Sequence, residues 1–319
     1  MSSNAKADTG VDDSEDVQVA RELLTILWSR RQDLIAFLRL HGRKETLVHL
    51  LTRIESAGGN IKKLFLNTRQ VHHLAFHELP TDELCSALLI LFQFLNVSVV
   101  HEVGAGTGLV AARLEDRIKS VTDAAAATNP VTIHASDNFS WNTPADGKTV
   151  RLDEDHIETY RPVEKCAFRD VKCGKDACIM VVWLPSTAEK SFYTDLVVAH
   201  APKYVIHIGE SDGGSCYTEE FSHKMTVDSG YIVHSIHAKQ ISQIDYFQRD
   251  RLRKATDSRT TITLWSRADN PPLTTEQLIK VCSGRDSAAS NLGTYSPLTT
   301  AYVMQDLSVS VGTAECVLQ

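Results

Sequence analysis

Residues 99–108 combine an acidic side chain with closely spaced glycines, a pattern that suits ligand binding through the backbone. They read Val-Val-His-Glu-Val-Gly-Ala-Gly-Thr-Gly, and a helical pattern of apolar residues begins at Leu109. Glycine adopts positive φ readily and lets a ligand approach the main chain closely. The start of the following helix would present unpaired N–H groups to that ligand. The segment therefore predicts a strand, a tight turn and a helix that together bind a nucleotide-type ligand.

The spacing of the glycines and the charge of Glu102 distinguish between kinds of nucleotide ligand. A dinucleotide-binding turn has its third glycine one position later, where this chain has Leu109. The sequence also lacks the Gly-x-x-x-x-Gly-Lys-Ser/Thr pattern of a phosphate-binding loop. Glu102 places a negative charge beside the turn, which disfavours a polyanion and favours a cationic ligand. A nicotinamide oxidoreductase and a turn that only connects strand to helix are the alternatives.

Polar and aromatic residues recur where three later apolar segments end. They are Asp137 and Asn138 after residues 131–135, Trp183 and Pro185 after residues 178–182, and Glu210 after residues 204–208. In an open parallel sheet the carboxyl ends of the strands form the ligand-binding edge, so these side chains are expected to gather near the glycine turn. A carboxylate at Asp137 can accept two hydrogen bonds from a ribose diol. An Asx turn or a helix cap is the structural alternative for Asp137.

Histidine and cysteine residues give only weak signals for a metal site. His72, His73 and His77 lie close together in the sequence, and a surface or structural role is favoured for them. Cys173 and Cys178 lack a second cysteine pair at the spacing of a zinc site. We therefore predict no metal centre.

Composition and charge are those of an ordinary globular protein. Of the 319 residues, 43 % are hydrophobic and 23 % are charged. No apolar run approaches the ~20 residues that span a bilayer, and the first residues lack the apolar core of a signal peptide. Seven cysteines at irregular spacing favour free thiols in a reducing compartment, so we expect a cytoplasmic protein with no membrane partner.

One basic cluster bears on nucleic-acid binding. Residues 249–254 contain three arginines and a lysine, and they follow Tyr246 and Phe247. Interleaved aromatic and basic side chains can bind nucleic acid. A solvated helix face is the favoured interpretation, and the formal net charge of −7 argues mildly against a broad nucleic-acid footprint. No oligomeric state is predicted.

The pattern of apolar residues divides the chain into four parts. Residues 1–15 are polar and acidic, as in a disordered tail, and residues 16–79 have the periodicity of a helical extension. Residues 80–269 alternate strands with helices and end in two strands, which is the layout of an α/β fold with a doubly wound, mostly parallel sheet. Residues 270–319 are rich in Ser, Thr, Gly and Pro, and are expected to be loosely ordered apart from a short strand at 301–304.

The stretch from Glu102 to Gly108 resembles the first motif of class I S-adenosylmethionine-dependent methyltransferases. The resemblance implies a Rossmann-like sheet and, as cofactor, S-adenosyl-L-methionine, which carries a sulfonium and an ammonium group. Glu102 would support the loop and the cationic methionine end, and Asp137 would hold the ribose. The cofactor-binding residues that the resemblance implies are Glu102, Gly104, Ala105, Gly106, Thr107, Gly108, Asp137 and Asn138.

A series of later segments is similar to an uncharacterised methyltransferase-like family with Trp-Pro and Ile-Gly-Glu motifs. In chain order the segments are Pro80-Thr81-Asp82-Glu83, Ser136-Asp137 with Trp141, Tyr160-Arg161-Pro162-Val163, Trp183-Leu184-Pro185, and Ile208-Gly209-Glu210 with Gly213-Gly214 and Cys216. In this resemblance Trp183 and Pro185 form a wall of the methyl-transfer pocket, and Glu210 faces the substrate. The implied function is methyl transfer to an unidentified acceptor.

Two departures from the family pattern support an alternative without catalysis. Amino methyltransferases of this class often carry Asn/Asp-Pro-Pro-Tyr/Phe after the fourth strand, where this chain has Trp183-Leu184-Pro185. The third-strand region has Cys166 where an acid contacting the adenine amine is expected, and Asp170 is the nearby substitute. A binding or scaffolding protein that kept the fold and lost the reaction is therefore the second interpretation.

Overall fold

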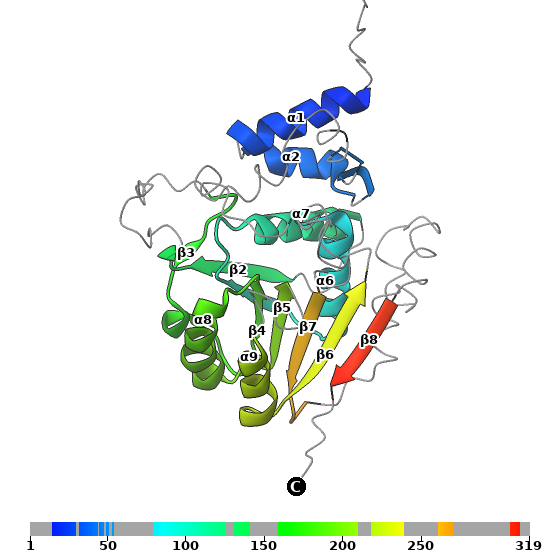
Figure 1. The fold of residues 1–319 in the computed structure, drawn as a ribbon. Coiled ribbons are helices and arrows are strands. Elements are labelled where there is room, and N and C mark those ends of the chain that lie inside the picture. Colours follow the sequence, from blue (N-terminus) through cyan, green and yellow to red (C-terminus); the bar gives the residue numbers. More distant parts are fainter. Residues whose placement is uncertain are drawn as a thin grey trace, which may run out of the picture.

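In the computed structural model, one mixed sheet forms the body of the protein and helices cover both of its faces (Figure 1). The described residues are 15–29, 32–43, 45–47, 49–50, 53, 79–124, 131–140, 159–209, 218–238, 261–270 and 307–312. No helix in these ranges combines the length and the apolar character that crossing a bilayer requires.

Eight strands of the described residues form the sheet, in the order β3-β2-β1-β4-β5-β7-β6-β8. Their bounds are β1 Val99–Val103, β2 Thr132–Asp137, β3 Glu164–Lys165, β4 Cys178–Val182, β5 Tyr204–Gly209, β6 Tyr231–Ala238, β7 Thr261–Arg267 and β8 Leu307–Gly312. The first five pair in parallel, whereas β7 is antiparallel to both β5 and β6, and β8 is antiparallel to β6. This arrangement confirms the doubly wound, mostly parallel Rossmann-like sheet that the resemblance implied.

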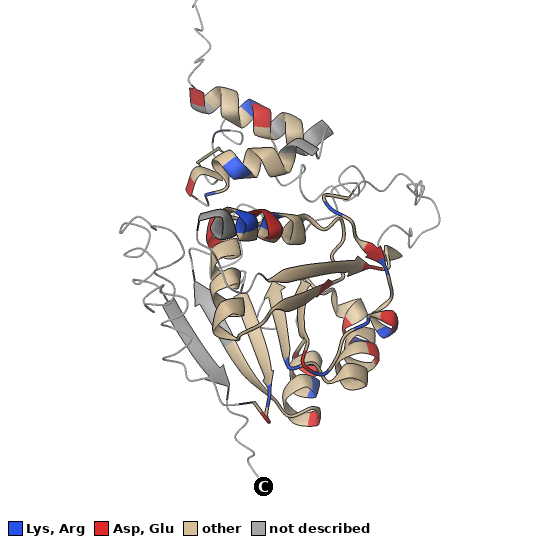
Figure 2. Ribbon diagram, turned by 180° about the vertical axis from the view of Figure 1, so that it is seen from behind, with Lys and Arg blue, Asp and Glu red and all other residues tan. Residues whose placement is uncertain are grey.

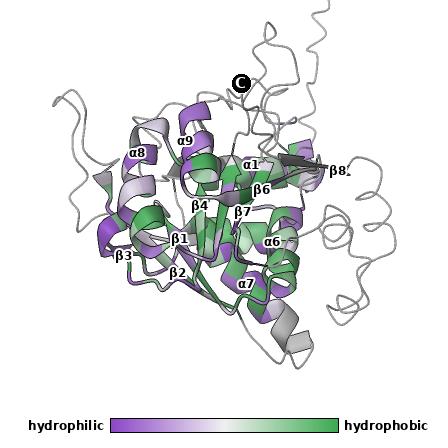
Figure 3. Cartoon of the chain, turned by 90° about the horizontal axis from the view of Figure 1, so that it is seen from below, coloured by the Kyte–Doolittle hydropathy of each residue, from purple (hydrophilic) through white to green (hydrophobic). Residues whose placement is uncertain are grey.

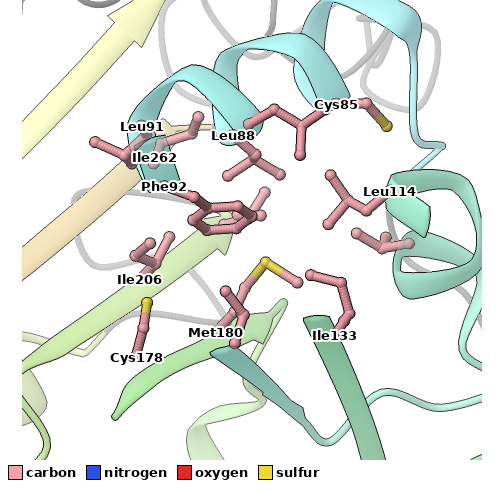
Figure 4. Close-up of a cluster of buried hydrophobic side chains, with 14 of the residues drawn as sticks. Cys85, Leu88, Leu91, Phe92, Leu114, Ile133, Cys178, Met180, Ile206 and Ile262 are labelled. Atoms are coloured by element: carbon pink, nitrogen blue, oxygen red, sulfur yellow. The ribbon is translucent and has the colours of Figure 1, made fainter. Parts of the chain in front are cut away.

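The helices on the two faces of the sheet bury separate apolar clusters. The helical elements are α1 Glu15–Ser29, α2 Gln32–His41, α6 Asp82–Phe94, α7 Leu109–Ala124, the 3₁₀-helix η3 Phe168–Asp170, α8 Ser186–Ser191, the π-helix η4 Phe192–Val198, α9 Glu219–His223 and the π-helix η5 Lys224–Asp228. On one face, Phe92 of α6 and Leu114 of α7 pack over Met180 of β4 (Figure 4). On the other, Phe192 of η4 and Phe221 of α9 pack in the cluster that contains Trp265 of β7. Burial on both faces explains the continuous apolar run of β4.

Hydropathy and charge follow this layering. Seen from below, hydrophobic residues concentrate on the central strands and on α6, and hydrophilic residues mark α8 and α9 (Figure 3). Charged residues gather on the helices and connecting segments, and the central strands carry few of them (Figure 2). The helix α6 begins at Asp82, where the preceding Thr81 caps it by accepting a hydrogen bond of 3.2 Å from the N–H of Leu84.

The N-terminal helices pack against the start of α7. Residues from α1 and α2 share a buried apolar cluster with Leu109, the residue that follows the last glycine of the turn. The buried Arg113 of α7 fixes this contact: its Nη2 donates to the carbonyl of Leu38 at 3.0 Å and to Asp82 Oδ1 at 2.5 Å. Its Nη1 donates to Asp116 at 2.5 Å. The helical extension is therefore joined to the sheet domain directly beside the glycine turn.

Residues 307–312, which belong to the segment expected to be loosely ordered, form a strand. Strand β8 pairs with β6 in antiparallel register from Val233↔Gly312 to Ala238↔Leu307. The sequence Leu-Ser-Val-Ser-Val-Gly alternates apolar and small polar residues, as an edge strand does. The sequence-based prediction followed the Ser, Thr, Gly and Pro content of residues 270–319 and did not identify this strand. The strand expected at residues 301–304 lies outside the described residues, and the four domain boundaries stay predictions.

Candidate functional site

The glycine turn connects β1 to α7 at the carboxyl edge of the sheet. All three glycines have positive φ, +65° at Gly104, +56° at Gly106 and +73° at Gly108. The N–H of Ala105 donates to the carbonyl of Ser136 at 3.0 Å, and the N–H of Gly108 donates to the carbonyl of Ala105 at 2.8 Å. The turn is thus held to the end of β2, and the strand, turn and helix predicted from the sequence are present in that order.

Gly104 and Gly108 are glycines for different reasons. A Cβ built at Gly104 has no described atom within 4 Å, so this side of the turn is open among the described residues. A Cβ at Gly108 would lie 2.8 Å from Cγ2 of Val163 and 3.0 Å from Cγ of Arg161. Gly108 therefore permits close packing of the segment before β3. The lack of a side chain at Gly108 therefore serves the packing of the fold, and its role in lining a ligand stays a prediction.

Asp137, at the end of β2, is bonded to the turn itself. Its buried carboxylate accepts a hydrogen bond of 2.7 Å from the N–H of Gly106 and another of 2.5 Å from the N–H of Phe139. The second bond is the Asx turn that the sequence analysis weighed as the structural alternative. Asn138 is exposed, and its side chain accepts from the N–H of Ser140 at 3.0 Å. The carboxylate therefore orients the glycine turn. Its expected role in binding a ribose beside this turn stays a prediction.

Glu102 lies on β1, two residues before the first glycine of the turn, and is almost fully buried, at 1 % exposure. Its side chain accepts a hydrogen bond from the N–H of Ala111 in the first turn of α7. Its Oε2 has no hydrogen-bond partner among the described residues. Burial raises the pKa of Glu102 to about 8, and the negative charge of Asp137 adds to this, while the positive charge of Arg161 and the Ala111 hydrogen bond oppose it. A cation brought close to this carboxyl would favour its ionised form.

Arg161 is a residue of this site that the sequence analysis did not single out. Its Nη2 donates to the carbonyl of Ile133 in β2 at 3.0 Å and lies 2.9 Å from Oε1 of Glu115 in α7. Its Nε and Nη1 are buried without a hydrogen-bond partner among the described residues. The only sequence signal was its place in the Tyr160-Arg161-Pro162-Val163 motif.

Trp183 follows β4 in an uncommon backbone conformation. Its φ is +53°, which is an outlier for a bulky residue, and its N–H donates to the carbonyl of Ile208 at 2.7 Å. Pro185 precedes α8 as its N-cap. The partly exposed Trp183 therefore lies at the same edge of the sheet as the end of β5. Glu210, which directly follows β5, lies outside the described residues.

Of the remaining predicted candidates, Cys166 lies beside Asp137, whereas others are exposed or fall outside the described residues. Cys166 directly follows β3, and its N–H donates to the carbonyl of Asp137 at 3.0 Å. Asp170, the proposed substitute for the missing acid, is exposed and lies 3.8 Å from Arg169. The described ranges contain no group of three potential metal ligands. The histidines at 72, 73 and 77 and the basic cluster at 249–254 fall outside the described residues.

Comparison with curated sequences identifies two viral relatives. No family model matches the chain. The uncharacterized protein R822 of Acanthamoeba polyphaga mimivirus is 29 % identical over 240 residues, which are 73 % of this chain and 38 % of that protein. The uncharacterized protein R839 of the same virus is 29 % identical over 208 residues, 63 % of this chain and 41 % of that protein. The chain therefore spans about two fifths of the length of these relatives.

Solved structures with a related arrangement are distant. The methyltransferase domain of bacterial CtHen1-CN has a TM-score of 0.36 and 15 % identity, covering 58 % of this chain and 97 % of that one. The 23S rRNA methyltransferase ErmE has a TM-score of 0.27 and 14 % identity, covering 60 % and 72 %. Protein LPL1258 of Legionella pneumophila has a TM-score of 0.30 and 12 % identity, covering 73 % and 96 %.

Proposed function

We propose that this chain is an S-adenosylmethionine-dependent methyltransferase that acts on an unidentified acceptor. The observation that carries the proposal is the buried Glu102, which precedes a turn of positive-φ glycines and whose Oε2 has no hydrogen-bond partner among the described residues. A buried carboxyl with a raised pKa is stabilised in its ionised form by a cationic ligand, and the methionine end of this cofactor is cationic. The open side of Gly104 allows a ligand to approach the main chain.

The proposal assigns some residues to cofactor binding and others to the pocket of the methyl acceptor. Glu102 holds the ammonium group of the methionine moiety, and the backbone of the glycine turn lines the cofactor. Asp137 holds the ribose, which is compatible with its bonds to Gly106 and Phe139 because a carboxylate offers about four lone-pair sites. Trp183 and Pro185 wall the pocket of the acceptor, and Glu210 faces it. The bound cofactor supplies an electrophilic methyl group, and the chain contributes chiefly by holding the acceptor in line with it.

A protein that binds the same ligand without catalysis is the second candidate. The observation that favours it is the sequence Trp183-Leu184-Pro185, which has no side-chain amide to accept hydrogen bonds from a target nitrogen. This candidate retains the roles of Glu102 and Asp137 and removes that of Glu210.

Two assays on the full chain separate these candidates. A thermal-shift panel of S-adenosylmethionine, S-adenosylhomocysteine, NAD and ATP identifies the ligand, because a ligand that binds the folded state raises the melting temperature. Transfer of labelled methyl groups to RNA, protein and small-molecule extracts then tests catalysis. Stabilisation by the two sulfur compounds with transfer supports the enzyme, whereas tight binding with no transfer to any extract supports the scaffold. Stabilisation by NAD alone overturns the cofactor assignment.

A further inference from the structure

We propose that the N-terminal helices α1 and α2 hold the glycine turn in its ligand-binding conformation through the positioning residue Leu109. Packing of these helices on α7 and binding of a ligand at the turn are then coupled, and each stabilises the other. This inference rests on the proposed function for the identity of the ligand. The coupling of the helices to the turn can be measured without any ligand.

Leu109 joins the glycine turn to the N-terminal helices. It is the first residue of α7, directly after Gly108, and its side chain is only 1 % exposed. It belongs to the apolar cluster of α1 and α2, whose buried members from those helices are Ala20, Leu23, Ile26, Leu34, Phe37 and Leu38. The next two residues of α7, Val110 and Ala111, belong instead to the cluster that covers the sheet. The first turn of α7 is therefore held between the sheet on one side and the N-terminal helices on the other.

Tyr160 makes a second connection between the turn and the same cluster. Its N–H donates to the carbonyl of Thr107, within the turn, at 2.9 Å. Its partly buried side chain packs against the cluster that contains Leu109. Tyr160 comes from the segment before β3, so its contact is independent of α7. Two residues from distant parts of the chain thus connect the end of the glycine turn to the N-terminal helices.

Polar contacts fix the end of α2 on the sheet domain. The N–H of Asp82, the first residue of α6, donates to the carbonyl of Gly42 at 2.9 Å. Arg113, one helical turn after Leu109, donates to the carbonyl of Leu38 at 3.0 Å. A Cβ at Gly42 would lie 2.9 Å from Oδ1 of Asp82 and 3.2 Å from Nη2 of Arg113, so the packing is close here. A displacement of α2 would therefore break hydrogen bonds as well as apolar contacts.

The composition of the turn makes it dependent on such neighbours. Glycine loses more conformational freedom on ordering than any other residue, and three glycines lie within five positions here. Asp137 holds the middle of the turn through the N–H of Gly106. Leu109 holds its end. If the N-terminal helices release Leu109, a ligand has to order the turn itself, and it binds more weakly in proportion.

The first test measures hydrogen exchange in the ligand-free chain. Leu38→Ala removes a fully buried side chain of α2 and leaves the sequence of the turn unchanged. The N–H groups of Gly108 and Ala112 donate to the carbonyls of Ala105 and Gly108, and they should exchange about tenfold faster in this variant. Leu38→Val is the milder variant, in case the alanine variant does not fold.

Met225→Ala is the matched control. Met225 is also fully buried, in the cluster on the other face of the sheet with Phe221 and Trp265. Its replacement should lower the unfolding free energy without selectively accelerating exchange at Gly108 and Ala112. Equal acceleration in the two variants would show that the N-terminal helices contribute only general stability, and that result would overturn the inference.

The second test measures the affinity of S-adenosylhomocysteine by calorimetry. Leu38→Ala should lower the affinity about tenfold, whereas Met225→Ala should change it by less than about twofold. Leu109→Ala should reproduce the loss from the side of the turn, and Leu109→Met, which keeps an apolar side chain of similar size, should restore most of it. Saturating S-adenosylhomocysteine should in turn slow exchange of the amides of α2, because coupling between two sites is reciprocal.

The two tests fail in distinguishable ways. Faster exchange at Gly108 and Ala112 in Leu38→Ala, together with no binding of S-adenosylhomocysteine by the unaltered chain, would support the coupling and contradict the proposed function. Binding with the same affinity in the unaltered chain and in both leucine variants would contradict the inference and leave the proposed function standing. An equal loss of affinity in Leu38→Ala and Met225→Ala would do the same.

Discussion

The carboxylate of Asp137 accepts a 2.7 Å hydrogen bond from the N–H of Gly106, so the end of β2 fixes the turn that follows β1. The two residues are 31 positions apart in the sequence. The bond joins the two parts of the chain that the resemblance assigns to the same cofactor.

Replacing Asp137 should therefore affect the loop as well as the ligand. Asp137→Ala leaves the N–H groups of Gly106 and Phe139 without their acceptor, and we expect it to weaken S-adenosylhomocysteine binding by about 1–3 kcal/mol. Asp137→Asn keeps one carbonyl oxygen as an acceptor and should lose less. Calorimetry on both variants checks this order, and equal affinity in all three chains would remove Asp137 from the site.

The two ends of the glycine turn should respond differently to alanine. Gly108→Ala places a Cβ 2.8 Å from Val163 and is expected to lower the unfolding free energy by about 1–3 kcal/mol. Gly104→Ala meets no described atom and should cost only the strain of its positive φ, about 1 kcal/mol. Denaturant unfolding measures both. Val163→Ala should recover part of the loss in the Gly108 variant, and no recovery would show that packing on Val163 is not the cause.

Arg113 should be the main polar link between the N-terminal helices and the sheet domain. Arg113→Met leaves Asp82 and Asp116 without this partner, and we expect it to destabilise the fold by about 3–5 kcal/mol. Arg39 also pairs with Asp116, at 2.8 Å, but its side chain is 57 % exposed. Arg39→Met should therefore cost at most about 1 kcal/mol. Unfolding curves that show similar losses for the two variants would contradict this assignment.

If the chain is an enzyme, Trp183 and Glu210 should matter more for turnover than for cofactor affinity. Trp183→Ala removes a wall of the acceptor pocket and is expected to lower turnover by about 10- to 100-fold. Glu210→Gln keeps the shape and removes the charge, so it separates proton handling from packing. Both should bind S-adenosylhomocysteine almost normally. Loss of binding and turnover in parallel would instead place these residues in the core or in the cofactor site.

Local patterns in the sequence were sufficient for the fold and for the position of the glycine turn. The apolar run of β4 and the glycines after β1 each report on a neighbouring stretch of the chain, and both were predicted. The bonds of Asp137 to Gly106 and the packing of Arg161 on Gly108 join distant segments, and residue spacing does not encode them. Strand β8 was missed because its alternation is short and its partner β6 lies far away in the sequence.

The central claim is that Glu102 recognises the ammonium group of a methionine-derived cofactor. The most direct measurement is a calorimetric comparison of S-adenosylhomocysteine with methylthioadenosine, which lacks the amino-acid end, on the unaltered chain and on Glu102→Gln. The account predicts that S-adenosylhomocysteine binds more tightly as pH rises toward 8 and above, that Glu102→Gln weakens it about tenfold or more, and that methylthioadenosine shows neither effect. Equal losses for the two compounds, or no heat with either alongside clear binding of NAD, would contradict it.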